Sequence, residues 1–379
     1  MRSFDVIIIG RGMTGLSTAR HLKSYGIESV CIIGPNRDFT NCSSLNAGYA
    51  SCSLHDNISR IVHGHGDEAA SELLGLIRRG FSGLMTEASR FDTPVTEGQV
   101  FRLTESAMEE REMLVATSWL SAHGFPAATN KTRTSSRTLT FQSDGAASAS
   151  IDVRHLMDHM ESDVEFTIRS DKVVGVTPHP GHIEVRTQTG GKILSQIVVV
   201  AGHVGIKALI PKLESCLVNH ADQWAEFEFR GKHPALTPGS LVFADFGQYW
   251  LSVTSNQKIR AGGARYLRKW AGVEADHAWL EERITDSIRN RIADLFGVEL
   301  SAASQQHAVL DLRACDEIPI IGPMFDDSRV LVSGGYMGSG LTLGYAAGAG
   351  LADFIGKGTS KSVPEIFHPK RLRSLPNVP

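Results

Sequence analysis

The chain has few cysteines, no block of like charge and no long apolar run. Its five cysteines are an odd number without a C-x-x-C pair, so the sequence suggests neither a disulfide framework nor a zinc site, and we predict no metal. A net charge of -3 without a basic block argues against nucleic acid as the main partner. No apolar run approaches the length of a membrane span. A strand that starts at Phe4 leaves no room for a signal peptide, so we expect a cytoplasmic protein.

What is present favours a globular protein with a large core. The 379 residues are 42% hydrophobic and 21% charged. A chain of this length and composition can bury a large core, and we expect two lobes rather than one. Small molecules are therefore the expected partners. The composition leaves the oligomeric state open.

The N-terminal segment 4–15, FDVIIIGRGMTG, is an apolar run followed by glycines in G-x-G-x-x-G spacing. Gly10 permits a tight turn, Gly12 allows the backbone to approach a pyrophosphate, and Gly15 allows a helix to pack on the strand. The helix that follows would present free N–H groups to an anion. Because this motif lies between a buried strand and a helix, it predicts a dinucleotide site rather than a chance run of glycines.

The segment after the second predicted strand, 29–33, lacks the acid that usually binds a ribose about twenty residues beyond such glycines. Gly34 takes its place, followed by Pro35, Asn36 and Arg37. We expect the polar residues of this stretch to replace the acid. Arg37 suits a 2′-phosphate, or is a solvated loop residue.

Periodicity predicts helices over 68–89, 105–123 and 276–296, the last with an apolar stripe from Leu280 to Leu295. Strands are expected at 164–176, 183–187, 193–200 and 330–333. The run 193–200 ends in Ala201-Gly202 and resembles another strand of the nucleotide-binding sheet. A glycine-rich turn at 334–340 then leads into a small-residue helix at 341–355. It is either a structural turn or a second helix N-terminus aimed at a ligand, and Gly348 and Gly350 within the helix indicate close packing.

A second lobe is predicted from the middle of the chain. Strands at 224–229, 240–243, 249–253 and 259–262 favour an antiparallel sheet over the substrate, and the polar stretch 127–149 is expected to form loops or edge strands. The predicted class is α/β, with a discontinuous Rossmann-type domain (1–90, 150–215 and 312–379) and a substrate domain with an antiparallel or mixed sheet and flanking helices (91–149 and 216–311).

These motifs occur in an order that resembles the D-amino-acid-oxidase-like flavoproteins, among which glycine oxidase, sarcosine oxidase and D-amino-acid dehydrogenases look nearest. The resemblance rests on the N-terminal glycines, the Ser43-x-x-Asn46-Ala47-Gly48 loop, VVVAG at 198–202, and RACDEIPIIG leading to GGYMGSGL. It implies FAD, held non-covalently because Cys315, which resembles the flavin-linking cysteine of sarcosine oxidases, has a different spacing. The implied FAD-binding residues are Gly10, Gly12, Met13, Thr14, Gly15, Gly34, Asn36, Arg37, Ser43, Ser44, Asn46, Ala47, Gly48, Val173, Ala201, Gly202, Gly338, Ser339, Gly340, Leu341 and Thr342.

The resemblance also implies residues at the substrate. Arg313 stands where glycine-oxidase-like enzymes hold the substrate carboxylate, and a guanidinium fork suits that group. Tyr249 matches a tyrosine of the substrate lid. The alternatives are a structural salt bridge for Arg313 and a half-buried sheet aromatic for Tyr249.

Three further basic residues have counterparts in sarcosine oxidases. Arg60 and His63, in SRIVH, resemble residues that lie against flavin and substrate, and Arg260 resembles a lysine that activates oxygen. His63 and His65 alternatively cap a helix that begins at Gly66.

The implied reaction is oxidation of the C–N bond of an amino acid or related amine, by hydride transfer to flavin N5 and hydrolysis of the imine. Oxygen or a quinone would take the electrons. Two other classes stay open: a flavin monooxygenase, and a non-catalytic FAD-binding assembly protein. The first is disfavoured because LVSGGYMGSG replaces the usual G-D-A-A-H-like segment, and no second G-x-G-x-x-G serves NAD(P)H.

Overall fold

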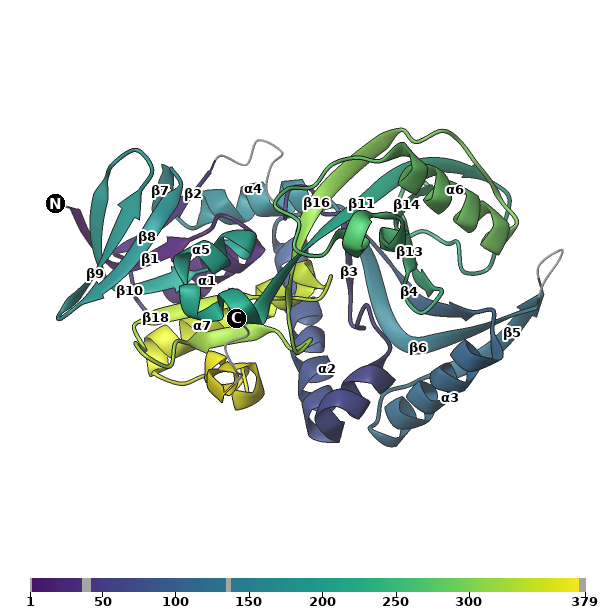
Figure 1. Cartoon of the computed structure of the whole chain (residues 1–379), viewed down its shortest axis with the longest axis horizontal. Coiled ribbons are helices and arrows are strands. Elements are labelled where there is room, and N and C mark those ends of the chain that lie inside the picture. The colour runs from purple at the N-terminus through teal and green to yellow at the C-terminus, as the bar shows by residue number, and fades with distance from the viewer. Residues whose placement is uncertain (1, 36–41, 134–137, 375–379) are drawn as a thin grey trace.

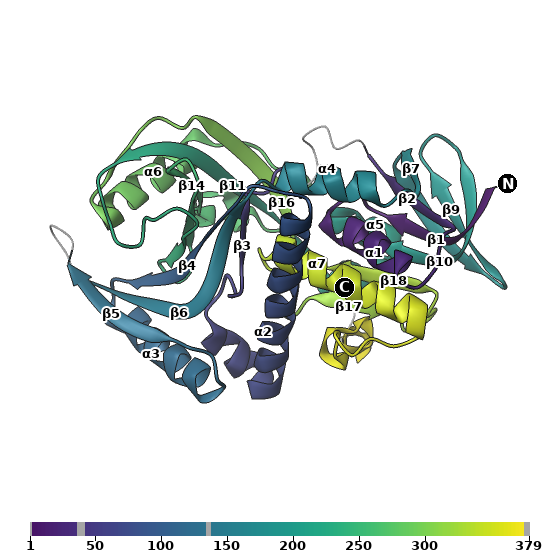
Figure 2. The ribbon, with the colours of Figure 1, turned by 180° about the vertical axis from the view of Figure 1, so that it is seen from behind.

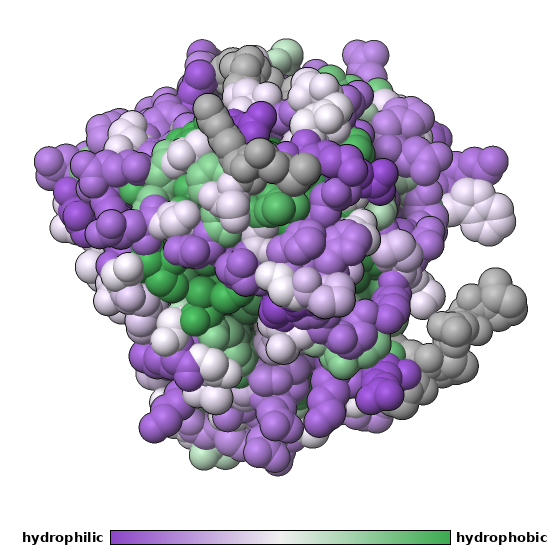
Figure 3. Space-filling model, turned by 90° about the vertical axis from the view of Figure 1, so that its left-hand side faces the viewer, coloured by the Kyte–Doolittle hydropathy of each residue, from purple (hydrophilic) through white to green (hydrophobic). Residues whose placement is uncertain are grey.

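The computed structural model describes residues 2–35, 42–133 and 138–374. It contains two sheets toward opposite ends of the molecule, with the long helix α2 (Ile58–Arg90) running between them (Figures 1 and 2). Within these ranges, no helix is both long and apolar enough to cross a membrane. The end that carries the first sheet has a mostly hydrophilic surface, with some apolar side chains visible near its centre (Figure 3).

The first sheet is mainly parallel, as the α/β prediction requires. Its strand order is β17 (Ile320–Pro323), β18 (Val330–Gly334), β10 (Lys192–Val200), β1 (Arg2–Ile9), β2 (Val30–Gly34) and β7 (Thr167–Ser170), with β9 (His182–Thr187) on β10 and β8 (Val173–His179) on β9. Ile9 pairs with Val200 and Ile33, and Val200 pairs with Val332. The carboxyl ends of four strands therefore meet at one edge, where ligands bind in such sheets.

The predicted strand 164–176 is wrong in its continuity. Val164 instead caps α4 (Val153–Asp163), and the remainder is divided into β7 and β8 by a turn at Asp171 and Lys172. The Asp171 carboxylate accepts a hydrogen bond from the Lys172 N–H and lies close to the Thr189 hydroxyl. This local side-chain bonding favours a turn over a continuous strand.

Helices α1 (Met13–Lys23) and α7 (Gly340–Lys357) pack against each other beside the first sheet. A Cβ added to Gly348 would lie 2.5 Å from the Cβ of Ser17, and one added to Gly350 would lie 2.2 Å from Val363. The predicted packing role of these two glycines is confirmed, because any side chain there would separate α7 from its neighbours.

The second sheet is larger and mixed. Its order is β15 (Glu299–Leu300), β11 (Leu217–Arg230), β14 (Lys258–Gly263), β13 (Tyr249–Val253), β12 (Leu241–Ala244), β4 (Val95–Thr104), β6 (Thr138–Ile151) and β3 (Tyr49–Ser51), with β16 (Gln305–Ala314) on β11 and β5 (Ala128–Arg133) on β6. All pairings are antiparallel except that of β12 with β4. The polar stretch 127–149 therefore includes β6, a strand paired on both sides, rather than only loops and edge strands.

Helices flank this sheet, as predicted, but their limits differ. Helix α3 (Ala107–Ala122) has a capping box between Ser106 and Glu109. Helix α6 (Glu282–Phe296) buries Ile284, Ile288, Ile292 and Leu295, which confirms most of the predicted stripe. It begins six residues later than predicted, and Leu280 is 51% exposed because it precedes the helix.

Helix α2 begins ten residues before its predicted start. The side chain of Asn57 accepts a hydrogen bond from the Ser59 N–H at 3.2 Å and caps the helix there. Gly66 forms a kink inside the helix, with φ 85° and ψ 173°. A helical segment does begin beyond this kink, close to the predicted start at 68. The ring of His65 contacts Asp316 O at 2.7 Å instead of capping that segment, and His63 is exposed.

Candidate active site

A large cavity lies where the carboxyl ends of β1, β10 and β18 meet the N-termini of α1 and α7. The empty space there is about 1020 Å³, which includes space open to solvent. Its walls are formed by Gly10, Arg11, Gly12, Met13, Thr14, Pro35, Cys42, Ser43, Asn46, Ala201, Gly202, His203, Asp311, Ser333, Tyr336, Gly338, Gly340 and Leu341. We call it the cofactor cavity.

The turn after β1 depends on Gly10. Its φ is +120°, and an added Cβ would lie 2.4 Å from the carbonyl oxygen of Ala201. Its N–H donates to Ile33 O at 2.8 Å. At Gly202 nothing lies within 4 Å of the position of a Cβ, so the missing side chain leaves open space in the cavity wall. Glycine at these two positions makes a cradle for a ligand that approaches the backbone.

Two helices begin at this cavity without side-chain caps. Helix α1 follows Gly12 and α7 follows Ser339, and neither has an acidic residue in its first turn. The Met13 N–H donates to Ser43 Oγ at 3.3 Å. The other N–H groups of the two first turns and the helix dipoles favour negative charge in the cavity. A glycine cradle with two helix N-termini fits a dinucleotide with a diphosphate and an electron-rich ring.

Arg11 occupies the space beside Gly34, where the side chain of a ribose-binding acid would otherwise lie. A Cβ on Gly34 would lie 3.0 Å from the Cγ of Arg11, so the arginine side chain lies over the end of β2. The Arg11 guanidinium is held by Glu161 of α4 at 2.7 Å and by the Ser170 hydroxyl at 3.0 Å. Asn36 and Arg37 lie outside the described residues.

Of the residues predicted for FAD, eleven line the cofactor cavity: Gly10, Gly12, Met13, Thr14, Ser43, Asn46, Ala201, Gly202, Gly338, Gly340 and Leu341. Ala47 lines a second cavity instead. Seven others line neither: Gly15, Gly34, Ser44, Gly48, Val173, Ser339 and Thr342. Val173 is buried in β8, paired with β9. Gly15 packs inside the turn, where a Cβ would lie 2.0 Å from Gly10 O.

The second cavity, which we call the substrate cavity, adjoins the first; its empty space is about 780 Å³, including space open to solvent. The two share Cys42, Asn46, Asp311 and Gly338. Of the residues predicted at the substrate, Arg313 lines this cavity. Its Nε bonds Asp311 at 3.2 Å and its Nη2 lies 4.0 Å from Asp222. Both the predicted position at the cavity and the alternative salt bridge therefore apply to Arg313.

The substrate cavity also contains residues that the sequence did not identify. They are Tyr49, His55, Asp222, Trp224, Trp250, Arg265 and Asp311. Because they come from β3, β11, β13, β16, η3 (Arg265–Leu267) and the loop before α2, no spacing along the chain connects them. Their only sequence signal is their residue type.

His55 is fixed by the loop that carries it. Arg102 donates hydrogen bonds to the carbonyls of Leu54, His55 and Asp56. Burial, together with Arg313 and Arg102, lowers the pKa of His55 to about 4 although Asp56 opposes the shift, so the ring is neutral near pH 7. Its Nδ1 is buried and has no hydrogen-bond partner among the described residues.

His203 was also missed, and it lies at the end of β10 in the cofactor cavity. Burial alone would lower its pKa. Cys42 and Asp311, together with the Leu310 carbonyl that lies 2.9 Å from Nε2, outweigh burial and raise the pKa of His203 to about 9. A protonated imidazole would add positive charge to the cavity.

Three predicted residues do not reach either cavity. The Tyr249 hydroxyl bonds Tyr266 of η3 at 2.8 Å and Ser287 of α6 at 3.0 Å, on the face of the second sheet that α6 covers. Arg60 is half exposed and pairs with Asp56 and Glu317. His63 is exposed on α2. The direction in which each side chain points depends on the strand register and on where α2 begins. The sequence pattern determined neither.

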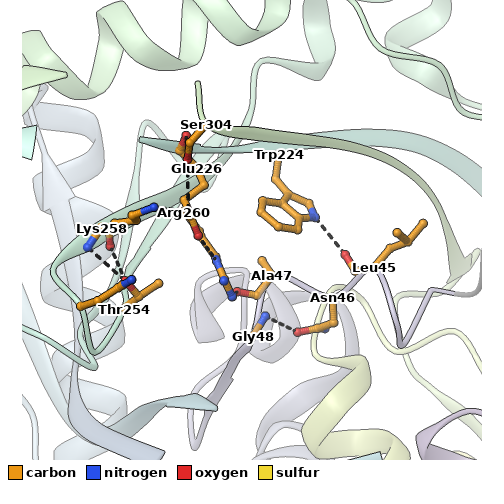
Figure 4. Close-up of polar contacts among 11 residues, drawn as sticks. Leu45, Asn46, Ala47, Gly48, Trp224, Glu226, Thr254, Lys258, Arg260 and Ser304 are labelled. Atoms are coloured by element: carbon orange, nitrogen blue, oxygen red, sulfur yellow. Dashed lines mark hydrogen bonds and ion pairs between the residues drawn. The ribbon is translucent and has the colours of Figure 1, made fainter. Parts of the chain in front are cut away.

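The side chain of Arg260 extends from β14 to the loop at 45–48 (Figure 4). It donates to the Glu226 carboxylate at 2.9 Å and, through Nη1, to Ala47 O at 3.0 Å, and it lines neither cavity. Trp224 Nε1 donates to Leu45 O at 2.9 Å, and Asn46 Oδ1 accepts from the Gly48 N–H at 2.8 Å. Residues of β11 and β14 thus hold the loop that places Asn46 between the two cavities.

Known structures share this fold over almost the whole chain. Glycine oxidase from Geobacillus kaustophilus matches with a TM-score of 0.77 and 14% identity, over 97% of this chain and 98% of that chain. L-proline dehydrogenase from P. horikoshii also gives 0.77 at 14% identity, over 98% of both chains. NikD, an unusual amino acid oxidase essential for nikkomycin biosynthesis, gives 0.73 at 14% identity, over 97% and 98%. No curated protein matches the sequence.

The sequence itself matches one family over most of its length. The match is to the family described as FAD dependent oxidoreductase, and it extends over residues 5–354. It includes the glycine turn, both strands that flank β1 and the start of α7, which are the elements that build the cofactor cavity. The chain therefore belongs to the DAO family of FAD-dependent oxidoreductases.

Proposed function

We propose that this enzyme oxidises the C–N bond of an amino acid or related amine. The observation that carries the proposal is the position of Arg313 in the wall of a cavity that shares lining residues with the cofactor cavity. A guanidinium at that place suits a carboxylate. Glycine oxidase and the amino acid oxidase NikD, which share the fold, support this substrate class.

FAD, when bound, would accept a hydride at N5 from the carbon next to the amine, and the imine would then hydrolyse in water. The chain itself supplies binding and orientation. Arg313 would hold the carboxylate, and the glycine cradle and the N-terminus of α1 would hold the diphosphate. The N-terminus of α7 would favour negative charge on the bound ring. We assign Arg260 a positioning role through the loop at 45–48.

We also propose that the cofactor domain comprises 1–90, 150–215 and 312–379 and the substrate domain 91–149 and 216–311. The two sheets support this division, since β1, β2, β10 and β18 form the first and β4, β11, β12, β13 and β14 the second. Strand β3, at 49–51, is an exception: it falls within 1–90 but pairs in the second sheet and carries Tyr49 into the substrate cavity.

The test is anaerobic reduction of the bound flavin, followed by its absorbance while amino acids and amines are added one at a time. At least one amino acid should bleach the flavin, and Arg313→Ala should raise its KM tenfold or more. The control is Arg60→Ala, which removes an arginine outside both cavities and should leave KM unchanged. Admission of air then separates an oxidase, which recovers its colour, from a dehydrogenase that needs a quinone.

The competing monooxygenase function has its own outcome in the same experiment. Rapid bleaching by NADPH, and none by any amine, would overturn the proposal. A flavin that neither amines nor NADPH reduce would instead favour a non-catalytic FAD protein.

A further inference from the structure

Strand β16 places a carboxylate and a guanidinium side by side in the substrate cavity. Asp311 and Arg313 are two residues apart, so they lie on the same face of the strand. Both line the substrate cavity, and Asp311 also lines the cofactor cavity. Of this pair, the negative group is therefore the one at the junction where the reacting carbon of a substrate has to lie.

Asp311 keeps capacity for a ligand. Its Oδ1 accepts from the Leu312 N–H at 3.0 Å and its Oδ2 from Arg313 Nε at 3.2 Å. A carboxylate accepts about four hydrogen bonds. Its side chain is 15% exposed, so a ligand charge placed there would be poorly screened by water.

The charges around the pair nearly balance. Arg265 contacts Asp222 at 3.4 Å and the Nδ1 atom of His220 at 3.0 Å, so this arginine and Asp222 largely compensate each other. Asp311 and Arg313 then meet a ligand as one negative and one positive group, with the positive charge of His203 nearby in the cofactor cavity. The groups that face them are Asp222 and His220 from β11, Arg265 from η3, Tyr49 from β3, His203 from η1 (His203–Gly205), and Cys42, His55 and Asp56 from loops.

We propose that Asp311 binds the substrate ammonium while Arg313 binds its carboxylate, so that the pair recognises the zwitterion of an α-amino acid. This inference rests on the proposed function. An α-amino acid carries its two charges on one carbon, and the adjacent groups of opposite charge on β16 complement that arrangement. Binding in this way directs the α-carbon toward the cofactor cavity.

The binding test uses two ligands with the same carbon skeleton, neither of which the enzyme can oxidise. One has no α-hydrogen, and the other has no amine. 2-Aminoisobutyrate has the ammonium and isobutyrate does not. Added to the FAD-loaded enzyme and followed by the change in flavin absorbance, 2-aminoisobutyrate should bind the natural protein at least tenfold more tightly. Asp311→Asn should remove that preference and leave isobutyrate unchanged or tighter. The matched control, Asp222→Asn, should keep most of the preference.

A pH profile gives an independent readout in the reacting enzyme. A carboxylate beside an ammonium raises the ammonium pKa, and the amine has to release a proton to solvent before its C–H bond can break. The rate of flavin reduction by an oxidisable amino acid should therefore rise with pH. Its midpoint should move about one pH unit lower in Asp311→Asn.

The outcomes separate this inference from the function on which it rests. If the natural protein binds neither ligand and no amino acid bleaches its flavin, the proposed function fails. If amino acids do bleach the flavin but the natural protein binds both ligands equally, or Asp311→Asn retains the preference and the pH midpoint, only the role of Asp311 is overturned. The comparison of the two ligands in the natural protein holds even if the variant does not fold.

Discussion

At the scale of single residues, Arg260 and Lys258 allow a matched comparison. Both donate to the carboxylate of Glu226, which is 3% exposed, but only Arg260 also holds Ala47 O (Figure 4). Arg260→Met should weaken FAD binding about tenfold, because loss of a charged hydrogen bond costs about 1.5 kcal/mol. Lys258→Met should change the affinity less than about threefold. Titration of the apoprotein with FAD, followed by quenching of flavin fluorescence, gives both values.

The two variants each remove one positive charge from Glu226, so a general loss of charge balance would affect them equally. Equal weakening by both would contradict a specific role of Arg260 in holding the loop. Arg260→Lys should recover part of the affinity, since an ammonium can still donate to one of the two acceptors.

Residues of the cofactor cavity were predictable where a local pattern determines them. Gly10, Gly12 and Ala201 follow buried strands at fixed spacing, and their position is set by the strand that precedes each one. His55 and Asp311 were not, because a loop held by Arg102 and the pairing of β16 with β11 bring them to the cavity. Tyr249 shows the opposite error: the strand was correct, but its hydroxyl bonds Tyr266 and Ser287, away from both cavities.

At the scale of elements, the kink in α2 offers a test with an internal control. Gly66 has φ 85° and ψ 173°, a conformation that is nearly confined to glycine, whereas Gly64 has no positive φ. Neither has an atom within 4 Å of an added Cβ, so only the backbone differs. Gly66→Ala should reduce the free energy of unfolding by about 1–3 kcal/mol, and Gly64→Ala should increase it by up to about 1 kcal/mol. Denaturant unfolding of both variants measures the two changes.

Loss of stability in both alanine variants would contradict this account of the kink. The same two glycines explain why the sequence placed the start of α2 too late. They interrupt the helical pattern, while the cap at Asn57 lies before them. Strands such as β13 and β18 were predicted within one residue, because a short apolar run between turn residues has few alternatives.

At the scale of the whole molecule, the two cavities depend on segments far apart in the chain. Cys42 borders both cavities together with Asp311 and Gly338, although more than two hundred residues separate it from either. Motif order was sufficient to predict the α/β class and the cofactor. It was not sufficient for the substrate cavity, whose walls come from the register of the mixed sheet.

The buried histidines predict a stability optimum near neutral pH. Burial and the nearby arginines lower the pKa of His55 and of His220 to about 4. As pH falls from about 6.5 to 4, the unfolded chain binds protons that the folded protein does not, so stability decreases. The pKa of His203 is raised to about 9 because Cys42 and Asp311 outweigh burial. Its contribution is complete below about pH 6.5 and is lost as pH rises toward 9.

Thermal unfolding of the FAD-loaded protein between pH 4.5 and 9 should therefore show a maximum midpoint near pH 6.5, with a decline on both sides. His220→Gln should flatten the acid side, since the amide oxygen can still accept from Arg265 without binding a proton. His203→Gln should flatten the alkaline side, because its amide N–H can still donate to Leu310 O. If the midpoint is constant across this range, or each variant affects the opposite side, the assigned charge states of these imidazoles are wrong.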